Sequence, residues 1–125
     1  SLVTDVGVRL PAHLTASGRS MLATLSREQL LALYPDDSAF ARRGDVAMTR
    51  LQLREELRAT RARGYATEHG DVTPGFGSVA VAIVDRVGWP IASLALTFDE
   101  STLVTDGLVS ALKSTAADIS RRLRV

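Results

Sequence analysis

The sequence predicts an α+β domain in which helices flank an antiparallel sheet. A nearly unbroken run of β-branched residues and alanines extends from Ser78 to Asp85, and a second apolar run extends from Ile91 to Phe98 after a short turn. Two such runs around a turn are typical of an antiparallel hairpin. Segments with helical patterning lie before and after the hairpin in the chain, and this order of elements favours the α+β class.

The composition indicates one globular domain and excludes several classes of function. The chain has 125 residues, of which 46% are hydrophobic and 23% charged, a balance typical of a single globular domain. Its net charge of +1 provides no overall field that would attract nucleic acid or an anionic membrane. The absence of cysteine removes disulfides, thiolate nucleophiles and cysteine zinc sites, and it fits a cytoplasmic location. No apolar run is long enough to span a membrane, and the first residues do not resemble a signal peptide.

The first segment is predicted to form a short strand followed by a helix. Leu2–Val8 mixes apolar and polar residues with a glycine, Gly7, and predicts a short strand and a turn. The strand would already be under way at the first residue, so we expect the chain to have been cut from something longer. Pro11 ends this extension, and Thr15 is placed to cap a helix that runs to about Thr24. The small residues Ala16–Gly18 in the first turn would allow close packing or the close approach of a ligand.

Two further helices are marked by capping-box patterns at their beginnings. Ser26 is followed three residues later by Gln29, and Thr49 is followed in the same way by Gln52. The third helix is predicted to end at Gly64, because glycine suits the left-handed position after a helix. The arginines of this helix are predicted to face water as a solvated surface, and they include Arg50, Arg54, Arg58 and Arg61.

The C-terminal half is predicted to contain the sheet and one long helix. Tyr65–Glu68 is expected to be a strand, and Gly70–Gly77 a loop that leads into the hairpin. Because its first strand is almost continuously apolar, we expect helices to cover that strand on both faces. The last helix is predicted from about Thr105 to Arg124. Its apolar stripe is predicted to consist of Leu108, Leu112, Ala116, Ile119 and Leu123.

Three segments in this order resemble a known family of bacterial regulators. Residues 10–19 read LPAHLTASGR, residues 63–66 read RGYA, and residues 78–82 read SVAVA, followed by GWPIASL at 88–94. Together they are similar to the effector-binding domain of the IclR-type (isocitrate lyase regulator) transcription factors. The resemblance extends from about Val6 to Arg122.

The resemblance implies a fold, a function and a set of partners. The fold would be a GAF-like antiparallel sheet flanked by helices, incomplete at its N-terminus, and residues 1–125 would form one effector-binding domain fragment. It would bind a small-molecule effector, self-associate as a dimer or tetramer, and require no cofactor or membrane. DNA binding would belong to an N-terminal winged helix that the chain does not include.

The resemblance also implies which residues line the effector pocket. The polar side falls on Glu68, Ser78, Ala95 and Thr97, and the apolar side falls on Leu2, Ala16, Ser17 and Phe76. Gly18 would contribute to a helix start whose free amides could hold an anion, although tight packing is an equal alternative.

The effector is expected to be a small organic acid or aromatic metabolite, and two departures from the family pattern favour a different or more apolar ligand than a two- or three-carbon keto acid. Ala95 lacks a hydroxyl that is common there, and Phe98 is expected to place a ring at the pocket rim.

Other functions remain possible at this level. Glu68 and Ser78 could serve a small enzyme acting on an acyl or keto substrate, but no G-x-S-x-G motif or metal-ligand cluster accompanies them. Glu68 and His69 are adjacent in a strand and should point to opposite faces, so they are not expected to act as an acid–base pair. His13 is expected to be structural. A third possibility is a dimerisation module with a vestigial pocket.

Overall fold

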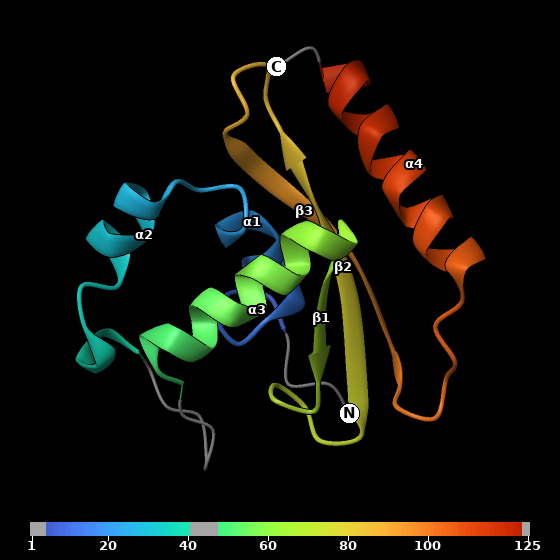
Figure 1. Cartoon of the computed structure of the whole chain (residues 1–125). Helices are drawn as coiled ribbons and strands as arrows, with labels where there is room; N and C mark the ends of the chain where they lie inside the picture. The colour runs from blue at the N-terminus through green and yellow to red at the C-terminus, as the bar shows by residue number, and fades with distance from the viewer. Residues whose placement is uncertain (1–4, 41–47, 124–125) are drawn as a thin grey trace.

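The computed structural model describes residues 5–40 and 48–123 and confirms the α+β class. Helices α1 to α3 precede a small sheet, and the long helix α4 follows it (Figure 1). The elements are α1 (Ala16–Leu22), α2 (Arg27–Leu33), the 3-10 turn η1 (Asp37–Ala39), α3 (Arg50–Arg63), β1 (Ala66–His69), β2 (Phe76–Val84), β3 (Pro90–Asp99) and α4 (Asp106–Leu123).

The sheet has three antiparallel strands in the order β1-β2-β3. Pairing places Ser78 opposite Thr97 and Ala80 opposite Ala95, and the register shifts once near the hairpin turn, between Ile83 and Val84. The predicted hairpin is therefore confirmed, with both strands slightly longer than expected.

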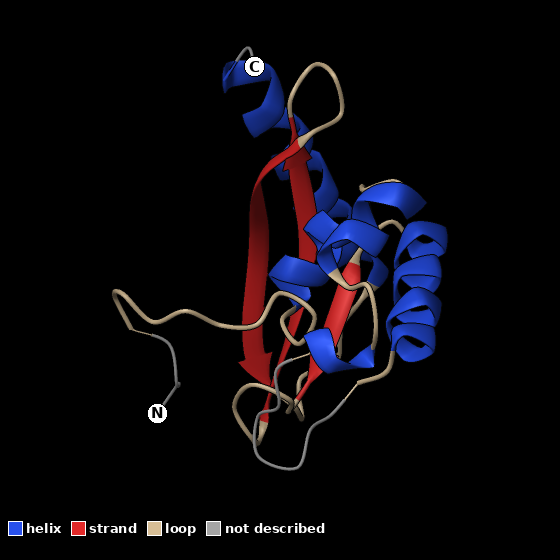
Figure 2. Ribbon diagram, turned by 90° about the vertical axis from the view of Figure 1, so that its left-hand side faces the viewer, coloured by secondary structure: helices blue, strands red, loops and turns tan. Residues whose placement is uncertain are grey.

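Helices cover the two faces of this sheet, as the apolar run in β2 predicted (Figures 1 and 2). Helix α1 lies on one face, where Ala16 forms a buried cluster with Ala66 of β1 and Ala80 of β2. Alanines here bring the helix close to the strands because they have almost no side chain. Helix α4 covers the opposite face, and its Ser120 hydroxyl donates to the Val84 carbonyl oxygen at 2.8 Å.

The predicted helix boundaries hold where capping residues mark them. The Ser26 hydroxyl accepts from the Gln29 amide at 3.2 Å, and the Gln29 side chain accepts from the Ser26 amide at 2.7 Å. Thr49 and Gln52 form the same reciprocal pair. Gly64 ends α3 with φ of 83°, a left-handed conformation that most side chains avoid.

The turn predicted within Leu2–Val8 is confirmed at Val6 and Gly7, and the first part of the predicted strand, up to residue 4, lies outside the described residues. The predicted apolar stripe of the last helix is wrong in part. In α4, Val109 is buried beside Leu112 and Ala116, whereas Leu108 is only half-buried and Leu123 is 51% exposed. Several stripes fit a helical period, and the sheet beneath α4 determines which one is covered.

Candidate functional site

A pocket of about 300 Å³ lies between the beginning of α1, the loop after β1 and the hairpin. Seven of the residues predicted from the resemblance line it: Ala16, Ser17, Glu68, Phe76, Ser78, Ala95 and Thr97. Five others were not predicted: Val8, Leu10, Thr15, Val72 and Thr73. Leu2 lies outside the described residues.

The strand register arranges the floor of this pocket in two rows. Glu68 of β1 pairs with Ser78 of β2, which pairs with Thr97 of β3, so three polar side chains cross the sheet on one face. The Ser78 and Thr97 hydroxyl oxygens are 2.9 Å apart, as their predicted side-by-side placement requires. The neighbouring row consists of alanines, and Ala16 of α1 packs on two of them. All three members of the polar row line the pocket, whereas only Ala95 of the alanine row does.

Glu68 shapes the pocket wall as well as lining it. Its side chain is buried, with the residue only 4% exposed. Carboxylate oxygen Oε2 accepts from the Asp71 amide at 2.7 Å and from the Val72 amide at 3.4 Å. These bonds fold the loop after β1 back toward the strand, and Val72 in that loop lines the pocket. A carboxylate satisfied by backbone amides is a stable acceptor at the end of the polar row.

Arg19 connects three segments beside the pocket, and it was not predicted as part of the site. This buried side chain donates from Nε to the His13 carbonyl oxygen and from Nη1 to the Thr67 carbonyl oxygen, both at 2.8 Å. Its Nη2 donates to Asp71 Oδ2 at 3.2 Å. The segment before α1, strand β1 and the pocket loop are therefore joined by one guanidinium. The sequence feature that could have indicated Arg19 is a charged residue directly after the small residues at the beginning of α1.

Gly18 does not line the pocket, so its predicted place in the site is corrected. Its amide donates to the Thr15 hydroxyl at 2.9 Å, which is an ordinary N-cap bond rather than a free donor for an anion. A Cβ at this position would lie 2.1 Å from the Ala12 carbonyl oxygen. Glycine is required here because the backbone of the preceding turn crosses α1 at close range.

Phe98 also differs from its expected position at the pocket rim. Adjacent strand residues point to opposite faces, and Thr97 occupies the pocket face. The Phe98 ring instead lies over Gly77, with its Cε2 atom 3.2 Å from where a Cβ would stand. Phe98 is therefore not part of the pocket lining, whose apolar members are Val8, Leu10, Ala16, Val72, Phe76 and Ala95.

The two histidines lie apart from the pocket lining. Glu68 is buried while its neighbour His69 is exposed, as strand alternation predicted. His13 is buried and makes edge-on ring contacts with Phe40 and Tyr34, which agrees with a structural role. Over residues 5–40 and 48–123 no cluster of three or more metal-ligating side chains occurs. Within the same described ranges, none of the helices has the length and apolar character needed to cross a membrane.

Comparison with known proteins identifies the family. The model of the bacterial transcriptional regulator IclR C-terminal domain matches residues 1–121. The HTH-type transcriptional repressor AllR of Escherichia coli K12 is 28% identical over 125 residues, which covers 98% of this chain and 46% of AllR. The crystal structure of the repressor BlcR of Agobacterium tumefaciens matches with a TM-score of 0.84 and 31% identity, over 98% of this chain and 51% of that one.

A third relative was solved with a ligand. The inducer-binding domain of the PobR transcription factor from Acinetobacter, a double mutant in complex with 3-hydroxybenzoic acid, matches with a TM-score of 0.73 and 25% identity, over 93% of this chain and 69% of that one. The chain spans about half the length of the AllR proteins it matches. These relatives are named for transcriptional regulation rather than for a reaction, in agreement with the predicted regulatory role. The chain therefore belongs to the family of IclR-type bacterial transcriptional regulators, of which it is a C-terminal, effector-binding domain.

Proposed function

We propose that the pocket above the Glu68–Ser78–Thr97 row binds a small organic acid or aromatic metabolite. The observation that carries this proposal is the row itself, because the register aligns three polar side chains on the floor of a pocket whose other walls are largely apolar. Few convergent polar groups in an otherwise apolar hollow are typical of small-molecule sites. At about 30 Å³ per water molecule, 300 Å³ suits a ligand on the order of ten non-hydrogen atoms.

The charge of Glu68 determines how such a ligand would be oriented. An anionic group would be repelled at the Glu68 end of the row and would be accepted at the other end. There one of the two hydroxyls of Ser78 and Thr97 donates to the other, and the second hydroxyl is left to donate to the ligand. A ligand hydroxyl would donate to Glu68, and an apolar body would rest against Phe76 and Ala95. An aromatic hydroxy acid satisfies all three requirements. The PobR complex with 3-hydroxybenzoic acid supports this ligand class.

In the whole regulator, binding would change oligomerisation and DNA binding by a domain outside this chain. A ligand can do this only if it binds one arrangement of the protein more tightly than another. The loop after β1 would change when the ligand binds. Glu68, which lines the pocket, and the Arg19–Asp71 ion pair beside it both make contacts to this loop. A more ordered loop in the bound state would be the local change that reaches the rest of the protein.

A thermal-shift experiment with matched variants tests the proposal. We expect 3-hydroxybenzoate to raise the melting temperature of the wild-type domain, because a ligand at about 100 times its Kd stabilises the folded state by about 2.7 kcal/mol. The double variant Ser78→Ala, Thr97→Val should lose this shift. The control Ser114→Ala, Thr115→Val, on an exposed part of α4, should retain it.

Two outcomes would contradict the proposal. Equal shifts in both double variants would place the ligand elsewhere. No shift with any benzoate or keto acid in a screen would favour the dimerisation module with a vestigial pocket.

A further inference from the structure

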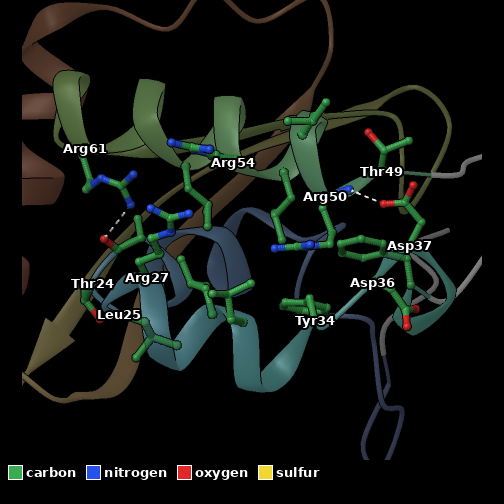
Figure 3. A pocket seen from close by; sticks show the side chains of 17 residues that line it. Thr24, Leu25, Arg27, Tyr34, Asp36, Asp37, Thr49, Arg50, Arg54 and Arg61 are labelled. Atoms are coloured by element: carbon green, nitrogen blue, oxygen red, sulfur yellow. Dashed lines mark hydrogen bonds between the residues drawn. The ribbon is translucent and has the colours of Figure 1, made fainter.

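A second and larger pocket of about 910 Å³ lies between α2 and α3. It shares no lining residue with the pocket on the sheet, and Figure 3 shows its lining side chains between the two helices. Its volume is near the upper end of the range for pockets that hold small molecules. The family resemblance made no prediction about this region.

One half of this pocket is apolar. Leu53 and Leu57 of α3 are buried at its floor, while Leu30 and Tyr34 at the α2 side are only half-buried. Helix α2 buries none of its seven residues, although its sequence REQLLAL is rich in leucine. Leu30 and Tyr34 pack against the buried cluster of Leu53 and Leu57 but stay only half-buried, so α2 makes only part of the contact that an apolar helix face normally makes.

The other half carries a surplus of positive charge. Arg27, Arg50, Arg54 and Arg61 line the pocket, and Figure 3 shows Arg27, Arg54 and Arg61 toward one end and Arg50 toward Tyr34. In the described part of the chain, no carboxylate lies within 4 Å of the Arg27, Arg50 or Arg54 guanidinium, whereas the outward-facing Arg58 of α3 pairs with Glu55 at 2.6 Å. Arg50, Arg54, Arg58 and Arg61 of α3 are exposed, as predicted, and all but Arg58 also line this pocket.

The two acidic residues of the pocket offset only part of the charge of these arginines. Asp37 accepts a hydrogen bond from the Arg50 backbone amide at 2.8 Å, and Asp36 caps η1 by accepting from the Ser38 amide and hydroxyl. The bonds from Ser38, and to a smaller extent the charge of Arg50, lower the pKa of the Asp36 carboxyl. Four guanidinium groups against two carboxylates leave the pocket cationic.

We propose that the α2–α3 pocket is a second ligand site that binds an amphipathic organic anion. The apolar or aromatic body of the ligand would pack between Leu30, Tyr34 and Leu57, and its carboxylate, sulfonate or phosphate would lie among the arginines. Guanidinium groups bind such anions through charge-assisted hydrogen bonds. Binding would give α2 the buried surface that it lacks, so α2 would become more ordered.

A pair of fluorescent probes tests this site, since they share an aromatic body and differ in charge. 8-Anilinonaphthalene-1-sulfonate is anionic, and N-phenyl-1-naphthylamine is its uncharged analogue. We expect the double variant Arg50→Gln, Arg54→Gln to bind the sulfonate at least tenfold more weakly than the wild type does. Its affinity for the amine should change less than threefold. Arg58→Gln on the same helix is the matched control and should leave both affinities within twofold. Arg27→Gln tests the α2 wall independently and should weaken the sulfonate alone.

Two further measurements separate this site from the pocket on the sheet. The double variant Ser78→Ala, Thr97→Val should bind the sulfonate with the same affinity as the wild type. Hydrogen exchange of residues 27–33 should slow when the sulfonate is bound. A sulfonate affinity that stays within twofold in Arg50→Gln, Arg54→Gln would overturn the proposal. So would equal losses for both probes, or loss of sulfonate binding in the Ser78 and Thr97 variant.

Discussion

Replacing Gly18 with alanine should destabilise the domain, although alanine is the better helix former. A Cβ at this position would lie 2.1 Å from the Ala12 carbonyl oxygen and 2.5 Å from its Cα, whereas ordinary contact begins at 3.4 Å. These are backbone atoms, so no side-chain rotation relieves the overlap, and α1 must move away from the turn before it. Movement of α1 would also loosen its alanine contact with the sheet at Ala80.

The size of the effect follows from two opposing contributions. Overpacking of this kind costs about 1–3 kcal/mol or more, and the gain in helix propensity on changing glycine to alanine returns about 1 kcal/mol. Since the overlap is with backbone, we expect the upper part of the cost, and a net loss of about 2 kcal/mol in the free energy of unfolding. For a domain of this size that corresponds to a melting temperature lower by about 6–10 °C.

A second glycine in a helix provides the matched control. In α4, a Cβ at Gly107 would meet only the Thr105 hydroxyl at 3.9 Å, so Gly107→Ala should stabilise the domain by about 0.4–1 kcal/mol. Urea unfolding followed by circular dichroism measures both changes on the same scale. If Gly18→Ala were as stable as the wild type, or if both variants shifted in the same direction, the packing explanation for Gly18 would be wrong.

Two further predictions concern cations that join separate elements. Arg19→Gln should lower the free energy of unfolding by about 3 kcal/mol, because it leaves buried carbonyl oxygens without a donor. Asp71→Asn, at the partly exposed end of the same ion pair, should lower it by less than about 1 kcal/mol. Similar losses in the two variants, measured by urea unfolding, would contradict this assignment. Lys113 of α4 donates to the Arg63 carbonyl oxygen at 2.9 Å and lies 5.6 Å from the centroid of the Tyr65 ring. Lys113→Met should therefore lower the free energy of unfolding by about 0.5–1 kcal/mol. Tyr65→Leu should lower it less in the Lys113→Met background than in the wild type. Strict additivity in this double-mutant cycle would show that the two side chains do not interact.

Local features of the fold were readable from the sequence because each depends on neighbouring residues alone. The capping boxes at Ser26 and Thr49 act within one helical turn, and the left-handed Gly64 follows from the conformational freedom of glycine. The hairpin was predictable because its strands are consecutive and both are apolar. The family was recognisable for a related reason, since its motifs are short and occur in a specific order.

Tertiary contacts decided the features that depend on residues far apart in the chain. The row of Glu68, Ser78 and Thr97 exists because two strand pairings share one register, and a shift by one residue would turn every member of a strand to the other face. The same alternation placed Phe98 away from the pocket that it was expected to border. Local patterns also did not indicate that Arg27 of α2 and Arg54 of α3 line the same pocket. Only the packing of whole helices against one another determines which polar residues lie beside a pocket.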